Sequence, residues 1–365
     1  MIGWLGSHLP ARAEGAARFA SNHVTISMAT TSMATTSLQA PIDGFRTTAM
    51  LRRTFIVSAA AAGLSLGAPR LGRAETAPRL TLAPDATPPT GPAPATGYVS
   101  VNGLKHYCES HGSGEPLVLL HGGLGTIGML FGQLLPVLAR TRQVIAVELQ
   151  AHGHTADIDR PLSYEAMADD IAALIGQFGF ETADLFGFSL GGGVALQAAI
   201  RHPEVVRKLV VASTPYRRDG WFPEVLAGMA ALTSDNAAAM TGSLMHQFYV
   251  EVAPKPEDWP VLVAKTGQLL ARDYDWSAAV AAITAPVLIL TGDCDLVRTE
   301  HAVEMFRLLG GGAGGGLGGG SAAGLGGLSS SRLAVLPDTT HFSMLTCGDL
   351  VAAITRPFLD APMPL

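Results

Sequence analysis

The feature that most constrains the fold is a repeated alternation of short apolar runs with helix-like segments from about residue 116 onward. Residues 117–120 are continuously apolar, and 143–150, 183–188 and 206–213 repeat this pattern. Apolar strands separated by helices indicate a mainly parallel sheet that is covered on both faces. Ligands of such sheets collect at the carboxyl ends of the strands. We therefore expect a functional site at that edge.

The complete pattern predicts eight strands. Residues 97–112 alternate in polarity around an Asn102-Gly103 turn, which is typical of a hairpin at a sheet edge. Two later apolar runs, 286–290 and 332–336, add the last strands. Helices are expected over residues 128–140, 163–178, 190–202, 299–310 and 350–359, with Pro136 kinking or dividing the first. The predicted fold class is α/β, an eight-stranded, mainly parallel sheet with helices on both faces.

Two segments interrupt the alternation. Residues 216–281 look helical and hold three of the four tryptophans, so we interpret them as a helical lid inserted between core segments 97–215 and 282–365. An ordinary pair of surface helices is the alternative. Within this segment, Trp221, Phe222 and Trp259 are candidate substrate contacts. The Gly-rich residues 310–331 are of low complexity and predict a mobile loop. Their glycines do not indicate a phosphate-binding loop, because no strand precedes them and no Lys-Ser/Thr pair follows.

The N-terminal residues do not read as part of a globular fold. Residues 1–49 are rich in Ala, Ser, Thr and Met without a sustained period, which suggests an extension outside the domain. Residues 75–96 are dominated by Pro, Ala and Thr and predict an extended linker, so the folded part is expected to start near Gly97.

Residues 50–74 predict an export signal. Arg52 and Arg53 precede Phe55, a weakly apolar run and small residues suited to signal peptidase, a pattern that resembles a twin-arginine signal. An amphipathic helix is the alternative. The apolar run is too short and too rich in Ala and Ser for a membrane span. The expected location is the periplasm or the exterior of the cell.

Composition narrows the function classes. Of the 365 residues, 48% are hydrophobic and 15% charged, which allows one large domain or two ordinary ones. The formal net charge of −6, without a basic stripe, argues against a nucleic-acid partner. Three cysteines are too few for a disulfide scaffold. Cys294 and Cys347 are expected as free thiols, with a disulfide between them as the alternative.

The pentapeptide GFSLG places Ser189 between a predicted strand and a predicted helix. Such a strand–turn–helix elbow exposes a serine hydroxyl above the sheet, and small residues at Gly187 and Gly191 prevent backbone clashes. A second copy, GLSLG at residues 63–67, lies in the apolar run of the signal peptide and has no strand before it. The context therefore assigns the chemistry to Ser189 alone.

A serine nucleophile needs a base, which in turn is oriented by an acid. The strand at 286–290 leads to Asp293 and Asp295, and the strand at 332–336 leads to His341. All lie at carboxyl ends of predicted strands, in the order serine, acid, histidine expected for this architecture. The helical position of His301 suits a base much less.

From about Gly97 to its end, the chain resembles an α/β-hydrolase. The resemblance implies Ser189 as nucleophile, His341 as base and Asp295 as acid, with Asp293 as the fallback. It also implies an oxyanion hole formed by the backbone amides of Leu190 and Gly123, within the turn HGGLG at 121–125. Leu124 is the second candidate for the latter donor.

Other histidines are given supporting roles. His121 is expected to hold the turn after the first parallel strand by hydrogen bonding. His152 and His154 form a His-x-His pattern that would suit a metal, but no third ligand is evident. The triad itself requires neither a metal nor a cofactor.

These residues together predict a serine hydrolase that cleaves a small-molecule carboxylic ester through an acyl-enzyme. Apolar or aromatic esters of small to medium size are favoured by the aromatic and Met-rich residues of the predicted lid. A lactonase, a carbon–carbon bond hydrolase and a cofactor-free perhydrolase remain alternatives on the same triad, because fold alone does not determine substrate. An exported binding protein without catalysis is a further alternative.

Overall fold

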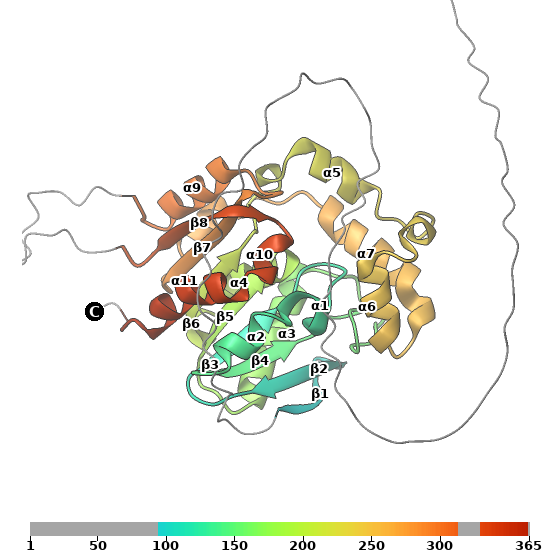
Figure 1. Ribbon diagram of the computed structural model, residues 1–365, viewed down its shortest axis with the longest axis horizontal. Helices are drawn as coiled ribbons and strands as arrows, with labels where there is room; N and C mark the ends of the chain where they lie inside the picture. Colours follow the sequence, from blue (N-terminus) through green and yellow to red (C-terminus); the bar gives the residue numbers. More distant parts are fainter. Residues whose placement is uncertain (1–93, 313–328, 364–365) are drawn as a thin grey trace, which may run out of the picture. The chain divides into compact units, whose positions relative to one another are not determined.

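A sheet of eight strands runs through the computed structural model, which describes residues 94–312 and 329–363 (Figure 1). Four predicted segments fall wholly or largely outside these residues: the extension 1–49, the signal 50–74, the linker 75–96 and the Gly-rich segment 310–331. The folded part begins with the first strand at Ala95, two residues before the predicted start.

The strand order is β1-β2-β4-β3-β5-β6-β7-β8. β1 pairs with β2 and β2 with β4 in antiparallel fashion, and all other neighbours are parallel. The strands are β1 (Ala95–Val101), β2 (Leu104–His111), β3 (Pro116–Leu120), β4 (Gln143–Val147), β5 (Ala183–Phe188), β6 (Val206–Ala212), β7 (Val287–Cys294) and β8 (Arg332–Thr340). The predicted eight-stranded, mainly parallel sheet is confirmed.

The edge hairpin follows from its turn. Asn102 and Gly103 have φ values of 48° and 80°, the positive values that a two-residue type I′ turn requires at both central positions. Asparagine and glycine tolerate this region better than other residues. The predicted hairpin is therefore confirmed.

Helices cover both faces of the sheet (Figure 1). In β3, Val118 and Leu120 join the apolar cluster of α3, α4 and α9, while Leu117 and Leu119 join that of α1, α2, α10 and α11. This is the two-residue period of a strand buried on both sides. The helices are α1 (Ile127–Phe131), α2 (Leu135–Leu138), α3 (Tyr164–Gln177), α4 (Leu190–Arg201), α9 (Thr299–Leu308), α10 (Ser343–Thr346) and α11 (Gly348–Asp360).

The division of the first helix at Pro136 agrees with the prediction, whereas some strand ends differ from it. Pro136 divides the helix expected at 128–140, and it occupies the first turn of α2, where its missing N–H breaks no helical hydrogen bond. β4 ends at Val147 rather than at residue 150. β8 continues to Thr340, well past its apolar run, because it remains paired with β7 as far as Cys294.

Residues 216–281, called the insertion below, are helical and connect β6 to β7. The helices are α5 (Pro223–Ala230), α6 (Leu244–Val252), α7 (Trp259–Ala271) and α8 (Ser277–Ala281). α6 and α7 contribute to a small apolar core that also includes Leu124 and Ala151, from the loops after β3 and β4. The insertion therefore packs on loops at the carboxyl ends of the strands.

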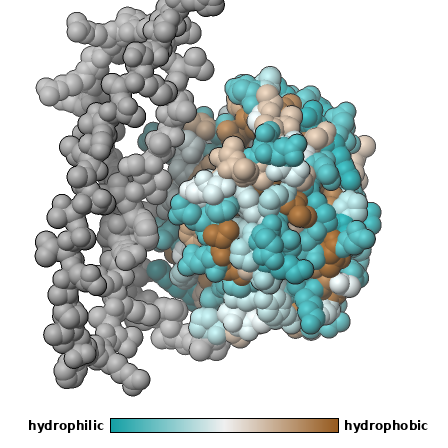
Figure 2. Space-filling view, turned by 90° about the vertical axis from the view of Figure 1, so that its right-hand side faces the viewer, coloured by the Kyte–Doolittle hydropathy of each residue, from teal (hydrophilic) through white to brown (hydrophobic). Residues whose placement is uncertain are grey.

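The face that Figure 2 shows is mainly hydrophilic, with its hydrophobic residues scattered rather than gathered into one patch. Scattered exposed apolar residues are normal for a protein surface. Within residues 94–312 and 329–363, no helix combines the length and the apolarity needed to cross a bilayer.

Candidate active site

Ser189 lies on a sharp turn between β5 and α4. Its φ of 53° and ψ of −118° fall in a sparsely populated region for a residue with a side chain. Two hydrogen bonds of 2.9 Å hold this turn: the Ser189 amide donates to the Ala212 carbonyl, and the Gly192 amide donates to the Ser189 carbonyl. The elbow predicted from the pentapeptide is thus present at this position.

Three glycines let the surrounding backbone segments approach the elbow. A Cβ at Gly187 would lie 2.6 Å from the Gly192 Cα, and one at Gly191 would lie 2.5 Å from the His121 carbonyl oxygen. A Cβ at Gly192 would lie 2.8 Å from the Thr214 Cβ. Side chains at these positions would require the backbone to move, so the small residues are a steric requirement.

The structure brings the three predicted triad residues together. The Ser189 Oγ lies 3.1 Å from the His341 Nε2, and the His341 Nδ1 lies 2.8 Å from the Asp295 Oδ1. Ser189 follows β5, Asp295 follows β7 and His341 follows β8, so three strand ends supply the series. This geometry allows proton transfer from the hydroxyl to the imidazole, and the carboxylate fixes the orientation of the ring.

Asp295 is buried but well supplied with hydrogen-bond donors. Its Oδ1 accepts from the Leu296 amide at 2.7 Å, and its Oδ2 accepts from the Gly292 amide at 3.0 Å and from the Ser213 hydroxyl at 2.5 Å. Burial by itself raises the pKa of Asp295, but hydrogen bonds from His341, Ser213 and Gly292 outweigh it and lower this pKa to about 2. The carboxylate therefore stays ionised.

Ser213 is a site residue that the sequence analysis missed. It follows β6, has a φ of 52° and is almost fully buried. A single serine after a strand carries no pattern of its own. Its contact with Asp295 depends on the pairing of β6 with β7, which only the folded structure reveals.

Asp293, the fallback acid, has a different role. Its carboxylate accepts hydrogen bonds from the backbone amides of Asp338 at 2.9 Å and Thr339 at 3.1 Å. These bonds tie the end of β7 to β8. The two aspartates thus have different roles: Asp295 contacts His341, and Asp293 joins the ends of β7 and β8.

The predicted oxyanion-hole residues lie on either side of Ser189. Leu190 is the first residue of α4, so its amide has no acceptor within the helix. The turn after β3 packs against the elbow, since a Cβ at Gly122 would lie 3.2 Å from the Ser189 Cβ and one at Gly123 would lie 3.3 Å from the Leu190 Cδ1. Leu124 has a φ of 58°, and its side chain packs into the core of the insertion.

His121 holds this turn. Its Nδ1 donates to the Gly122 carbonyl at 2.8 Å, and its Nε2 accepts from the Leu149 amide at 3.1 Å. Both bonds require the neutral ring. Burial and the neighbouring His152 lower the pKa of His121 to about 4. Its geometry fits the predicted supporting role.

His152, His154 and His301 each have separate contacts and do not point toward a shared metal position. The His152 Nδ1 donates to the Gln150 carbonyl at 2.8 Å, whereas the His154 ring contacts the buried Glu148 carboxylate at 3.0 Å. His301 is buried in α9, where its Nε2 accepts from the Tyr216 amide at 3.2 Å. In the described part of the chain, no three His, Cys, Asp or Glu side chains are grouped as a metal site would require.

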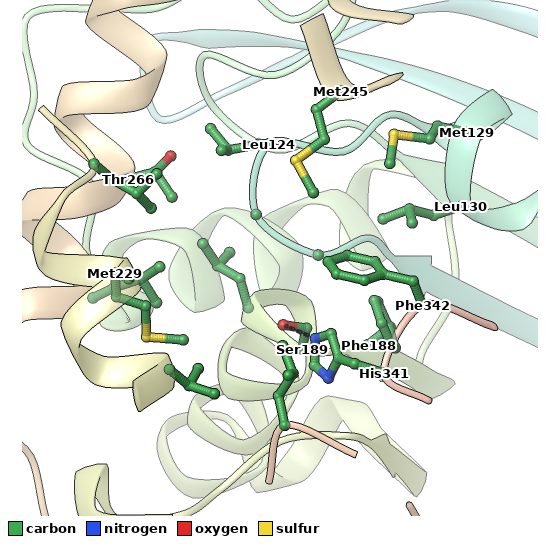
Figure 3. Close-up of a pocket in the computed structure, with 18 of the residues that line it drawn as sticks. Leu124, Met129, Leu130, Phe188, Ser189, Met229, Met245, Thr266, His341 and Phe342 are labelled. Atoms are coloured by element: carbon green, nitrogen blue, oxygen red, sulfur yellow. Dashed lines mark hydrogen bonds between the residues drawn. The ribbon is translucent and has the colours of Figure 1, made fainter. Parts of the chain in front are cut away.

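A cavity of about 360 Å³ opens above Ser189 and His341, at the small end of the range for ligand pockets (Figure 3). The insertion, the turn at 122–124, α1 and the loops after β7 and β8 form its walls. Its apolar side chains include Met129, Met229, Met240, Met245, Leu130 and Phe342. Among the described residues that line it, only Ser189, Thr266 and His341 carry polar side chains.

The predicted aromatic substrate contacts do not line this cavity, and the prediction is corrected on this point. Trp221 is buried and packs edge-on against the His341 ring, with 5.9 Å between ring centroids. Trp259 is buried in the core of the insertion and donates its indole N–H to the Ala237 carbonyl at 3.2 Å. Phe222 caps the start of α5. These three rings lie outside the cavity lining, whose insertion side includes Met229, Met240 and Met245.

The three cysteines all lie in the described residues, and all are free. Cys294 is exposed and Cys347 is half-buried. Burial raises the pKa of Cys108 to about 12, which keeps this thiol protonated.

Comparisons with known proteins agree with this architecture. The model of the alpha/beta hydrolase fold family matches residues 115–307, which is more than half of the chain. A pimeloyl-[acyl-carrier protein] methyl ester esterase from Neisseria meningitidis (serogroup B, strain H44/76) is 31% identical over 269 residues, covering 67% of this chain and 93% of that protein.

A 2-hydroxymuconate semialdehyde hydrolase from Pseudomonas sp. (strain CF600) is 37% identical over 112 residues, which are 30% of this chain and only 40% of that protein. Among solved structures, E-2-(acetamidomethylene)succinate hydrolase superposes with a TM-score of 0.57 at 23% identity, over 74% of this chain and all of that one. At this identity, the likeness supports the fold alone. The chain belongs to the α/β-hydrolase fold family and is related to hydrolases within it.

Proposed function

We propose that this protein hydrolyses carboxylic esters through an acyl-enzyme on Ser189, with His341 as base and Asp295 as the acid that orients it. The observation that carries the proposal is the hydrogen-bonded series from the Ser189 Oγ through His341 to Asp295, at the floor of an apolar cavity. A nucleophile, a base and an orienting acid within hydrogen-bond reach are the parts that acyl transfer needs.

The reaction proceeds in two halves. The Ser189 Oγ attacks the ester carbonyl carbon while its proton moves to the His341 Nε2; the bond to the leaving oxygen then breaks, and His341 protonates the alcohol. Water then attacks the acyl group while His341 takes its proton; the bond to the Ser189 Oγ breaks to release the acid, and His341 returns the proton to the Ser189 Oγ. Asp295 stabilises the imidazolium formed in each half.

The amides of Gly123 and Leu190 are proposed to stabilise the negative charge on the carbonyl oxygen. Both residues adjoin Ser189, and the Leu190 amide lies at the positive end of α4. In water-excluded sites of this kind, one such donor contributes about 3 kcal/mol of transition-state stabilisation.

The cavity favours small to medium, apolar acyl groups. Apart from His341, no residue among those described in its walls carries an ionisable side chain. A carboxylate on the substrate would therefore be buried without a cationic partner, which is costly. The unbranched methionine side chains adapt to chains of different shape.

A carbon–carbon bond hydrolase is the second candidate on the same residues. It is favoured by the similarity of part of the chain to 2-hydroxymuconate semialdehyde hydrolase. Lactones and peracid formation use the same nucleophile and belong in the same substrate panel.

The test is turnover of 4-nitrophenyl esters of increasing chain length, with lactones and aromatic esters alongside, by wild type and Ser189→Ala. We expect wild type to hydrolyse short and medium alkyl esters. Ser189→Ala is expected to lose this activity while its circular dichroism and melting temperature remain those of a folded protein. Unchanged turnover by Ser189→Ala would refute the assignment.

We also propose that residues 50–74 direct export. The support is the order of Arg52, Arg53, Phe55, the apolar run and the small residues after it. Mass spectrometry of the exported protein should find an N-terminus close to residue 75. A mature N-terminus before Met50 would contradict this proposal.

A further inference from the structure

Trp221 packs against the proposed base without forming a wall of the cavity. Its indole meets the His341 ring edge-on, with 5.9 Å between ring centroids and 64° between ring planes. The side chain is almost fully buried and is not among the residues that line the cavity, whereas His341 is. A substrate in the cavity therefore does not contact this indole, and any effect of the indole on the reaction acts through His341.

Main-chain pairing fixes the place of this residue. Trp221 forms an antiparallel bridge with Val297. Beside it, the Arg298 amide donates to the Gly220 carbonyl at 2.9 Å. These contacts do not depend on the side chain at position 221. The paired segment directly follows Asp295, and the Val297 amide also donates to the Asp295 Oδ1 at 3.3 Å.

Trp221 belongs to the insertion by sequence, but its contacts belong to the triad. It is absent from the apolar core that α6 and α7 form with the loops after β3 and β4. Gly220 lets the chain reach this position, because a Cβ there would lie 2.5 Å from the Pro215 Cβ and 2.6 Å from the His301 Cδ2. Trp221 therefore acts with the loops that carry Asp295 and His341.

His341 needs support beyond its hydrogen bonds. Its Nδ1 lies 2.8 Å from the Asp295 Oδ1, and its Nε2 lies 3.1 Å from the Ser189 Oγ. In the proposed reaction the Nε2 exchanges Ser189 for the leaving alcohol and then for water, so only the bond to Asp295 persists throughout. A ring that is bonded at one nitrogen tilts about that bond unless packing holds it.

Three aromatic rings pack on His341. The centroid distances are 4.9 Å for Phe188, 5.1 Å for Phe342 and 5.9 Å for Trp221. Both phenylalanines line the cavity, and Phe342 is 46% exposed (Figure 3). Their support therefore depends on what the cavity contains. Among these three rings, Trp221 alone is both buried and outside the cavity lining.

We propose that Trp221 is a positioning residue whose indole holds the His341 ring at its bond to Asp295 while the Nε2 exchanges partners. This inference rests on the proposed ester hydrolysis and adds a residue to its machinery. Because His341 serves both halves of the reaction and Trp221 does not contact substrate, loss of the indole should lower kcat and leave KM near the wild-type value.

Three variants test this proposal. Trp221→Leu removes the aromatic ring, whereas Trp221→Phe keeps a smaller one. Trp259→Leu is the matched control, because Trp259 is equally buried and also lies outside the cavity lining. Its ring packs on His246 and Tyr249 in the insertion instead of on His341.

Steady-state kinetics on one 4-nitrophenyl ester is the first measurement. We expect Trp221→Leu to lower kcat by about 10- to 100-fold, as small misplacements of a reacting group do. Its KM should stay within about threefold of wild type. Trp221→Phe should recover part of the lost kcat. Trp259→Leu should keep kcat within about threefold of wild type, although it removes a ring of the same size from the insertion core.

Proton NMR is the second measurement, and a general loss of stability does not move its signal. The Nδ1 proton of a histidine that is bonded to a carboxylate resonates far downfield, at a position that reports the geometry of the bond. The signal of the bond between His341 and Asp295 is assigned by its loss in His341→Gln. Trp221→Leu should shift or broaden this signal, whereas Trp259→Leu should leave it in place.

An unchanged kcat in Trp221→Leu would overturn the inference, and so would a lowered kcat with an unmoved downfield signal. Equal falls of kcat in Trp221→Leu and Trp259→Leu would also overturn it, because loosening of the fold would then be the cause. If Trp221→Leu does not fold, Trp221→Phe decides by the same two measurements. If wild type hydrolyses no ester, the proposed function fails, while the NMR signal still decides whether Trp221 positions His341. The two failures are therefore distinguishable.

Discussion

The elbow and the insertion face each other across one cavity, yet different forces hold them. At the elbow, the backbone is fixed by the positive φ of Ser189 and by glycines at 187, 191 and 192 that leave no space for a side chain. The insertion rests instead on a small apolar core and on side-chain contacts. The comparison shows that backbone conformation positions the nucleophile, whereas side-chain packing positions the part of the cavity wall that the insertion supplies.

Lys265 connects α7 of the insertion to the loop after β4 through polar contacts. Its Nζ donates to the Asp157 carboxylate at 2.5 Å and to the carbonyls of Ile158 and Arg160 at 2.9 Å each. It lies on α7, next to Thr266. We therefore expect changes at the elbow and triad to act on kcat, and changes in the insertion to act mainly on KM and on local stability.

The largest expected effect comes from the acid. Asp295→Asn keeps the shape of the side chain but removes its charge, so it should lower kcat by about 10⁴-fold, as in the serine-protease template. Asp293→Asn is the control, because Asp293 contacts only backbone amides of β8 among the described contacts. Its kcat should stay within a few-fold of wild type. The measurement is kcat from steady-state kinetics on one ester. Equal losses of kcat in Asp295→Asn and Asp293→Asn would contradict the assignment of Asp295 as the acid.

The next effect is a dependence of stability on pH. Burial lowers the pKa of His152 to about 4, against about 6.5 in an unfolded chain. Between these values the unfolded chain binds a proton that the folded protein does not, so the free energy of unfolding falls as pH drops from 6.5 to 4. The loss from one such imidazole is up to about 3 kcal/mol.

His152→Leu tests this account of the loop after β4. Urea unfolding near pH 7 and about pH 4.5 should show a smaller loss of stability in the variant than in wild type. Leucine also forfeits the bond from the ring to the Gln150 carbonyl, so the variant is expected to be less stable near pH 7. An unchanged difference between the two pH values would contradict the buried, neutral assignment of His152.

A smaller loss of activity is expected from Ser213, whose hydroxyl donates a hydrogen bond to Asp295. Ser213→Ala removes one of the hydrogen bonds to the Asp295 Oδ2, and kcat should fall by about tenfold because other donors remain. Serine and alanine both carry a Cβ at the φ of 52°, so Ser213→Ala adds no steric strain, and Ser213→Gly, which relieves it, serves as the second variant. If loss of the hydroxyl is the cause, both variants lose activity to a similar extent. Full activity in Ser213→Gly would contradict a role for the hydroxyl.

The smallest expected effect is at the insertion. Lys265→Met keeps much of the side-chain length but removes the donor that links α7 to Asp157 and to two carbonyls, which keep only their bonds from the Gln150 Nε2, so it should raise KM severalfold and loosen α7. Hydrogen exchange should report faster opening of α7, while peptides around Ser189 exchange as in wild type. A large fall in kcat with unchanged KM would contradict the separation between the two regions.

The sequence predicted the elbow and triad because their signals are local and ordered. The apolar runs marked the strands, and Ser189, Asp295 and His341 each follow a strand end, so sheet topology alone brings them to one edge. The glycines at 187 and 191 are required by backbone contacts, which leave a recognisable pattern in the sequence.

The walls of the cavity could not be predicted in the same way. Trp221 and Trp259 were predicted as substrate contacts because they are large aromatic residues. Both side chains are instead buried: Trp221 packs against the His341 ring, and Trp259 lies in the apolar core of the insertion. Ser213 has no motif, and its contact with Asp295 joins elements far apart in the chain. Residues 216–281 are helical and help to line the cavity, but the three aromatic residues predicted as substrate contacts are not among the lining residues.

The most direct test of the central claim is covalent labelling of the intact protein with diethyl 4-nitrophenyl phosphate. The reagent transfers a diethylphosphoryl group to an activated serine and releases 4-nitrophenol. We predict one label per protein, located by peptide mass spectrometry at Ser189, with ester hydrolysis lost in step with labelling and no label on Ser189→Ala. Labelling at another residue, or full hydrolysis after complete labelling of Ser189, would contradict the account.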